Sequence, residues 1–191
     1  HAKLSLCLSL LERSLEKAVE IGGEWLYDTV LTGAAAEAAY ARGVSQLKLR
    51  MEQLFIQQGN EFASTRARAH YYVEGAADEA CTGVSYYHFL CGLLEKADWA
   101  GLGAKLETLR AQVLQHAQLT VSLHGSEQAL DTLRTLLPGS RFAAQERDAA
   151  QPYVEPLTPP VNEAFIIDGG VNYAVQVWPM ERRSDRKALA R

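Results

Sequence analysis

Residues 82–94, TGVSYYHFLCGLL, decide the fold class of this chain. Their large apolar side chains follow the i, i+3, i+4, i+7, i+8 spacing of a single helix face, which carries Tyr86, Phe89, Leu90, Leu93 and Leu94. A turn at Thr82-Gly83 precedes this face, and Ser85 is the expected N-cap. The stretch therefore predicts a helix that packs against a core.

Similar helical spacing recurs on both sides of this stretch. Upstream it predicts one helix from Leu4 to Val19 that ends at Gly22-Gly23, and two more over residues 34–58 and 61–74, with an interruption at Gly75. Downstream it predicts helices over residues 99–116 and from a Ser126 cap to Pro138-Gly139. The chain is therefore predicted to be mostly helical.

Three segments favour extended structure instead. Residues 119–124 alternate apolar and polar side chains with a period of two, and residues 163–168 and 171–178 flank the Gly169-Gly170 pair. A strand needs partners to satisfy its backbone, so these segments are expected to join a sheet. The predicted fold class is α+β, mostly helical, with helices packed on a small sheet, followed by the first strands of a further unit.

Prolines indicate a domain boundary. Residues 141–162 carry four of them with mixed charges and little apolar periodicity, which is typical of an extended linker. The predicted organisation is a first unit over residues 1–140, the linker, and the start of another unit over residues 163–191.

Composition limits the function classes. Hydrophobic residues make up 48% and charged residues 22% of the chain, values typical of a folding globular protein. The net charge of −4 argues against nucleic acid or an anionic membrane as a partner. The three cysteines, Cys7, Cys81 and Cys91, form no C-x-x-C pair, so we expect a reducing compartment: the cytoplasm, or an organelle matrix in a eukaryote.

The sequence offers no complete active site. No two of the five histidines stand at metal-ligand spacing, and His70 with Glu74 is best interpreted as a helix-surface pair. Signatures of nucleotide binding, of serine hydrolases and of zinc peptidases are absent from the sequence. We therefore expect no catalytic residue, no bound metal and no cofactor in this chain.

Several motifs in order along the chain resemble a known family. They are QGNEFASTRARA at residues 58–69, TGVSYYHFL at 82–90, Trp99, Leu136-Leu137-Pro138, and the stretch from Asn162-Glu163-Ala164 to Val171-Asn172-Tyr173. Their order and spacing resemble the helical region just after the midpoint of presequence proteases, a branch of the pitrilysin and insulin-degrading-enzyme family of zinc metallopeptidases. The resemblance extends from about residue 4 to residue 178.

The resemblance implies a role for the chain. These enzymes contain four related α/β units, and their two halves close around a chamber in which unstructured peptides are cut. Residues 1–140 would be most of the third, peptidase-associated unit, and residues 163–191 would begin the fourth. The family's zinc site is an H-x-x-E-H motif in the first unit, which has no counterpart here, so zinc belongs to the parent enzyme and the chain alone is expected to be inactive.

The implied partners are the remaining units of the same peptidase and an unstructured peptide substrate. Arg66, Arg68 and His70 are the candidate peptide-facing residues, although a solvated helix face also explains this cationic run. One alternative is a stand-alone helical peptide-binding or regulatory module without catalysis. A thiol enzyme that uses Cys81 or Cys91 is the third hypothesis.

Overall fold

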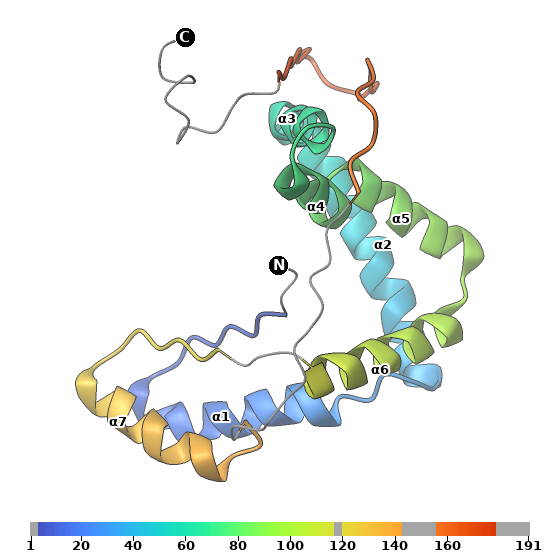
Figure 1. Ribbon diagram of the computed structural model, residues 1–191. Helices are drawn as coiled ribbons and strands as arrows, with labels where there is room; N and C mark the ends of the chain where they lie inside the picture. The colour runs from blue at the N-terminus through green and yellow to red at the C-terminus, as the bar shows by residue number, and fades with distance from the viewer. Residues whose placement is uncertain (1–3, 117–119, 143–155, 179–191) are drawn as a thin grey trace, which may run out of the picture. The chain divides into compact units, whose positions relative to one another are not determined.

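The computed structural model describes residues 4–116, 120–142 and 156–178, and helices dominate these ranges (Figure 1). In chain order the helices are α1 (Leu15–Gly23), α2 (Ala34–Gln57), α3 (Gly59–Ala69), α4 (Val73–Thr82), α5 (Val84–Lys96), α6 (Trp99–His116) and α7 (Glu127–Leu136). Short helical turns flank them: η1 (Glu12–Ser14), η2 (Glu24–Asp28) and η3 (Leu137–Gly139). Among the described residues, no helix is long and apolar enough to cross a membrane.

The chain divides into two compact units, and neither is continuous in sequence. One unit combines His1–Ala38 with Trp99–Tyr153, and the other combines Ala39–Asp98 with Val154–Arg191. The linker and domain bounds expected from the prolines stay a prediction, because residues 143–155 lie outside the described residues.

The first unit is built around α1 and α7. Their core consists of Leu15, Ala129 and Leu133, against which Val19, Leu123, Leu136 and Leu137 pack. As predicted, Ser126 is the N-cap of α7: its Oγ accepts a hydrogen bond from the backbone N–H of Ala129 at 3.2 Å. Glu12 reinforces this cap, because its carboxylate accepts hydrogen bonds from the Ser126 backbone N–H at 2.9 Å and from its Oγ at 2.8 Å.

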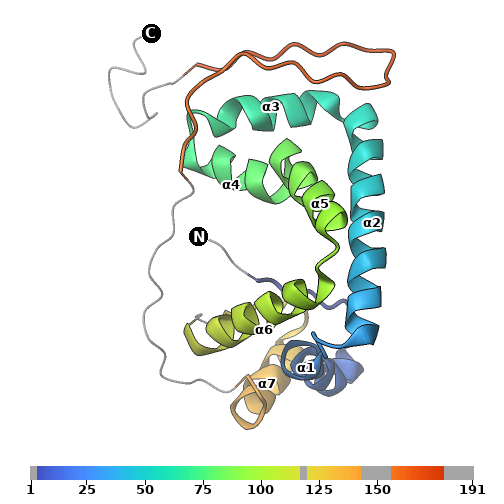
Figure 2. The same ribbon diagram turned by 90° about the vertical axis from the view of Figure 1, so that its right-hand side faces the viewer.

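The second unit contains most of α2 together with α3, α4 and α5. Helix α3 packs on α4, and α4 packs on α5 (Figure 2). Phe55 of α2 joins the packing through edge-to-face contacts with Phe62 of α3 and Tyr87 of α5, at ring-centroid distances of 4.6 and 5.2 Å. Leu90, at the centre of the predicted apolar stripe of α5, is only 2% exposed. Phe89 of the same stripe is 56% exposed, so the predicted apolar face is only partly covered.

The mostly helical part of the predicted fold class is confirmed, but its strands are not formed within the described ranges. Residues 120–124, 161–167 and 171–178 are extended without a sheet ladder. Their alternating side chains favour an extended backbone, while a strand also needs a neighbouring backbone to bond with. Figure 2 shows residues 156–178 as a chain that runs out and back without strand arrows.

Two predicted helix bounds are wrong, and so is the expected Ser85 N-cap. Helix α5 begins at Val84 and its N-cap is Gly83, which has no side chain to form a cap. The helix expected from Leu4 begins only at Leu15, after η1, and residues 4–11 are not helical. The leucines at 4, 6, 8 and 10 also have the period of two that suits an extended chain, so the spacing is ambiguous.

Gly75, where we expected an interruption, lies inside α4. The actual break is at residues 70–72, between the end of α3 and the start of α4. Gly75 serves close packing there instead of ending a helix. A Cβ atom at this position would lie 2.8 Å from the carbonyl carbon and oxygen of Arg68. The missing side chain therefore lets α4 approach the end of α3.

Candidate functional site

Arg66 of α3 holds an extended segment of the chain through a two-pronged ion pair. Its Nε donates to Oε2 of Glu163 at 2.6 Å, and its Nη2 donates to Oε1 of the same carboxylate at 2.7 Å. The two side chains are 24% and 28% exposed. This parallel geometry fixes the orientation of the carboxylate as well as its position.

The far side of the Arg66 guanidinium is bound by α4 and α5. Its Nη1 donates to Oε1 of Glu79 at 3.3 Å and to Oγ of Ser85 at 3.1 Å. The same Glu79 oxygen accepts the Ser85 backbone N–H at 2.8 Å, so a side chain of α4 satisfies a free donor at the start of α5. Arg66 therefore connects α3 with α4 and α5, and it binds Glu163 of the extended segment in addition.

Glu79 is the most deeply buried charged residue of this network, with 3% exposure. Its Oε2 atom has no hydrogen-bond partner among the described residues. A Cβ atom at Gly83 would lie 2.0 Å from that oxygen, so the Glu79 carboxylate occupies the space that any side chain at position 83 would need. Gly83 is thus required for packing here, and not for a left-handed backbone.

His70 holds the same extended segment one helical turn further along. It is 8% exposed, and its Nδ1 lies 3.0 Å from Oγ1 and 3.4 Å from the backbone oxygen of Thr158. Its Nε2 is 3.8 Å from Oε2 of Glu163. Arg66 and His70 are four residues apart and share a helix face, which explains why both reach one segment.

The charges of this cluster favour an ionised Glu163. Hydrogen bonds from Arg66 hold the pKa of the Glu163 carboxyl below its usual value. Burial opposes this lowering in part, and the charges of Arg66 and His70 add to it. The pKa of Arg66 is raised in turn, chiefly by its hydrogen bonds to Glu163. The ion pair is therefore formed throughout the neutral range.

The Arg66–Glu163 ion pair stands beside a cavity of about 940 Å³, which we call the α3 groove. Its helical wall comes from α2, α3 and α5, and its other wall is the extended segment itself, over residues 161–168 and 171–175. Phe55, Phe62 and Tyr87 make the helical wall apolar, while Arg66 and His70 add cationic or polar groups. A Cβ atom at Gly59 would lie 2.9 Å from the Tyr173 ring, so this glycine admits the ring close to the start of α3.

Tyr87 lines the groove and is bound from α2. Its hydroxyl donates to Oε1 of Glu52 at 2.8 Å, and Lys48 donates to the same carboxylate oxygen at 2.5 Å. The hydrogen bond to Glu52, followed by burial and a further bond involving Cys91, raises the pKa of Tyr87 to about 12. Tyr87 is therefore a neutral hydrogen-bond donor and not a ready proton source.

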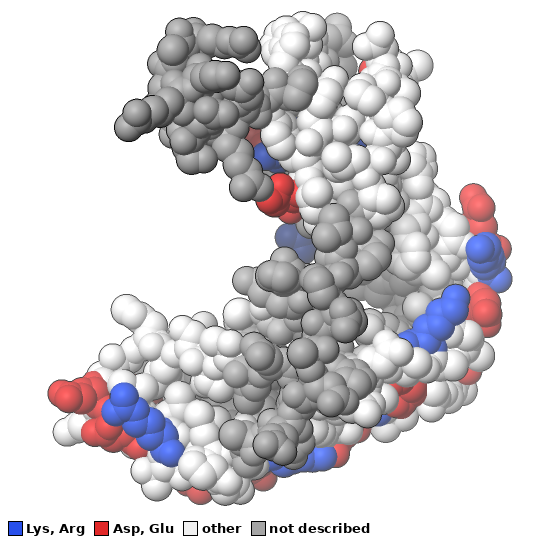
Figure 3. Space-filling model, viewed as in Figure 1, with Lys and Arg blue, Asp and Glu red and all other residues white. Residues whose placement is uncertain are grey.

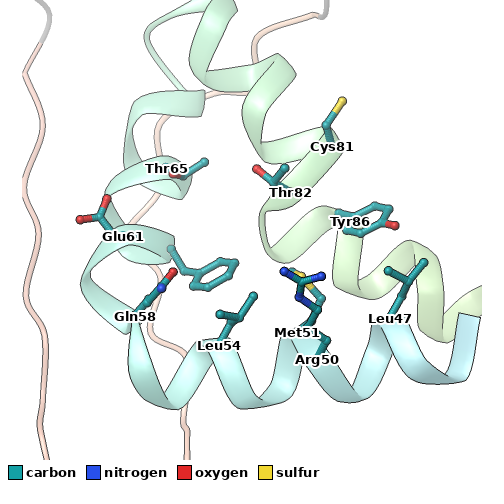
Figure 4. A pocket seen from close by; sticks show the side chains of 11 residues that line it. Leu47, Arg50, Met51, Leu54, Gln58, Glu61, Thr65, Cys81, Thr82 and Tyr86 are labelled. Carbon is teal, nitrogen blue, oxygen red and sulfur yellow. The ribbon is translucent and has the colours of Figure 1, made fainter. Parts of the chain in front are cut away.

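A smaller hollow of about 330 Å³ lies among α2, α3, α4 and α5 (Figure 4). Leu47, Met51 and Leu54 supply its apolar lining, and Arg50 and Glu61 supply charged groups. Neither residue of the Arg66–Glu163 ion pair lines this hollow. Within the described ranges, no three histidine, cysteine or acidic side chains gather as a ligand set for a metal ion. On the face in Figure 3, acidic and basic side chains are interspersed.

The structure brings together two of the three candidate peptide-facing residues. Arg66 and His70 contact the extended segment, whereas Arg68 lies outside the groove lining. That any of them faces a substrate peptide stays a prediction. Sequence reasoning missed Glu79, Thr158 and Glu163 as partners of this cluster, and no local pattern connects Arg66 with a carboxylate 97 positions away.

Comparison with known proteins gives one family match. Residues 1–93 match the family described as peptidase M16-C associated, a range that includes α1 to α4 and most of α5. No solved structure matches the chain. The match supports the resemblance to the pitrilysin family over these residues.

Proposed function

Residues 1–93 belong to the peptidase M16-C associated family, and from this premise we propose that the chain is part of a zinc-dependent metalloendopeptidase that degrades unstructured peptides. In this proposal the chain forms part of the wall of the peptide chamber and belongs to the half of the enzyme that closes it, and the zinc site lies elsewhere in the parent enzyme. The family match is the observation that carries the proposal.

The sequence supports a zinc site outside this chain. A zinc peptidase of this family needs two histidines and a glutamate in the H-x-x-E-H arrangement, and the sequence contains no such motif. A chamber that excludes water and folded protein needs a second half to close it. The chain would supply that half.

The extended segments are consistent with this role. Residues 4–10 expose Leu4, Leu6, Leu8 and Leu10 by 38–70%, and residues 161–178 expose seven large apolar side chains. Such surfaces are covered when strands join a sheet. We expect them to complete the α+β units of the fold class when the other units of the peptidase are present.

The test is complementation. The purified chain is mixed with a separately purified portion of the same peptidase that contains the H-x-x-E-H motif, and cleavage of an unstructured fluorogenic peptide is measured with and without a zinc chelator. We expect turnover only when both parts are present, and complete loss of turnover with the chelator.

An unchanged rate after addition of the chain would refute the chamber role. It would favour the stand-alone helical binding or regulatory module instead. A chain in which Cys81 and Cys91 are both replaced by serine should support the same turnover, and loss of turnover there would favour the thiol hypothesis.

A further inference from the structure

One wall of the α3 groove is already an extended peptide, which is a segment of the same chain. We propose that the helical wall of the groove, formed by α2, α3 and α5, is a receptor for an extended peptide segment that carries a glutamate or aspartate, and that residues 158–178 are its resident, displaceable ligand. This inference deepens the proposed function and rests on it for its biological meaning, since it names the class of peptide segment that this wall holds.

The receptor side is built independently of the segment it holds. Arg66 is fixed from behind by Glu79 and Ser85, at 3.3 and 3.1 Å, and both partners belong to the helices. The Nε and Nη2 edge of the guanidinium is therefore held in place for a carboxylate whether or not Glu163 is there. An arginine held in this way loses little conformational freedom when it binds a carboxylate, which is the condition for a specific site.

The resident segment shows which features the groove recognises. The hydroxyl of Thr158 contacts His70, and further along the segment the carboxylate of Glu163 binds Arg66. Aromatic and aliphatic side chains, Tyr173 and Ile167, then lie against Gly59. Recognition thus combines one anchored charge with an apolar portion, as expected for capture of an extended peptide on a mostly apolar surface.

The resident segment is poorly covered on its outer side, which makes it displaceable. Ile166 is fully exposed, and Trp178 is 65% exposed. Its polar attachment to the helices includes the Glu163 ion pair, the Thr158 contact with His70, and a hydrogen bond from the Tyr72 hydroxyl to the Trp178 backbone oxygen at 3.2 Å. Without the ion pair, little charge-specific attachment is left among these described contacts.

Binding in trans tests the inference directly. A fluorescent peptide with the sequence of residues 156–178 is titrated with the full chain, and fluorescence anisotropy gives the apparent Kd. In the wild-type chain the tethered segment competes at an effective concentration on the order of millimolar, so the added peptide should bind weakly. In a Glu163→Gln chain the tethered competitor is weakened, and the same peptide should bind about tenfold more tightly.

Two further variants separate recognition from general charge. In the Glu163→Gln chain, Arg66→Lys keeps the charge but loses the two-pronged geometry, and we expect about a tenfold loss of affinity. Arg68→Gln removes a cation of the same helix that lies outside the groove lining, and it should leave the Kd unchanged. A peptide that itself carries Glu163→Gln should bind the Glu163→Gln chain about tenfold more weakly than the unaltered peptide.

Equal affinity for both peptides, or equal losses from Arg66→Lys and Arg68→Gln, would overturn the proposal. If Arg66→Lys disturbs folding, which circular dichroism would reveal, the comparison of the two peptides on one folded chain still decides. No peptidase activity enters these measurements. A failure here therefore leaves the chamber role untouched, and a failure of complementation leaves the groove untouched.

Discussion

Replacement of Gly75 by alanine is the sharpest test of the helix packing that supports Arg66. In an exposed helix interior, Gly→Ala stabilises by about 1 kcal/mol, because alanine loses less backbone freedom on folding. Here the new Cβ would lie 2.8 Å from two backbone atoms of Arg68 and 3.0 Å from the backbone nitrogen of Ala69. Neither neighbour can rotate away, so α3 and α4 would have to separate.

Overpacking of this kind costs about 1–3 kcal/mol. A cost near the middle of that range exceeds the helix-propensity gain, so Gly75→Ala should destabilise the chain by about 1 kcal/mol. Gly92 provides the matched control, since it also lies within a helix, α5, but a Cβ atom added there would meet no atom within 4 Å. Gly92→Ala should stabilise by about 1 kcal/mol.

The assay is urea unfolding followed by far-ultraviolet circular dichroism, which gives the free energy of unfolding of each variant. We expect the two alanine variants to shift it in opposite directions and to differ by about 2 kcal/mol. An equal gain in both variants would refute the close packing of α4 on the end of α3. It would also remove the physical reason given for a glycine inside α4.

Ser126→Ala should lower the free energy of unfolding by about 1 kcal/mol in the same assay, because α7 loses its N-cap, whereas Ser122→Ala at an exposed extended position should leave it nearly unchanged. Glu163→Gln should lower the free energy of unfolding at neutral pH, and the difference from wild type should shrink below about pH 4. Because Arg66 lowers the pKa of Glu163 in the folded chain, the ionised carboxylate stabilises the fold above the unfolded-state pKa, and this stabilisation is lost as the pH falls through the folded-state pKa. A difference that does not change with pH would contradict the ion pair. Tyr87→Phe should leave the tyrosinate absorbance step near pH 10 unaltered, because the pKa of Tyr87 is raised to about 12, and a smaller step in the variant would show that the Tyr87 hydroxyl titrates normally.

Sequence patterns predicted those elements whose signals are local. The bounds of α2 and α6 follow from apolar spacing, and the start of α7 follows from a serine placed before a helical stripe. Residues 4–11 could not be assigned in the same way, because their leucines fit both a helix face and an extended alternation. Only the neighbours of that segment decide between the two, and a sequence window does not contain them.

The candidate site was partly within reach of the sequence. Residues at i and i+4 share a helix face while residues at i and i+2 do not, so Arg66 and His70 could have been grouped together and Arg68 set apart. The partner of Arg66 could not have been found by such spacing, because Glu163 lies beyond four further helices and the proline-rich segment. Long-range ion pairs depend on the path of the chain, which no local period encodes.

The contact between Glu79 and Gly83 has a consequence for sequence variation. The buried carboxylate fills the position of a side chain at residue 83, so the two positions are coupled by volume. Among related sequences, a residue larger than glycine at position 83 should occur together with a shorter side chain at position 79, and Arg66 should then be replaced as well, since it would lose a partner. Positions 66, 79 and 83 are therefore expected to change together. A related sequence that changes only one of them should have less stable packing where α3, α4 and α5 meet.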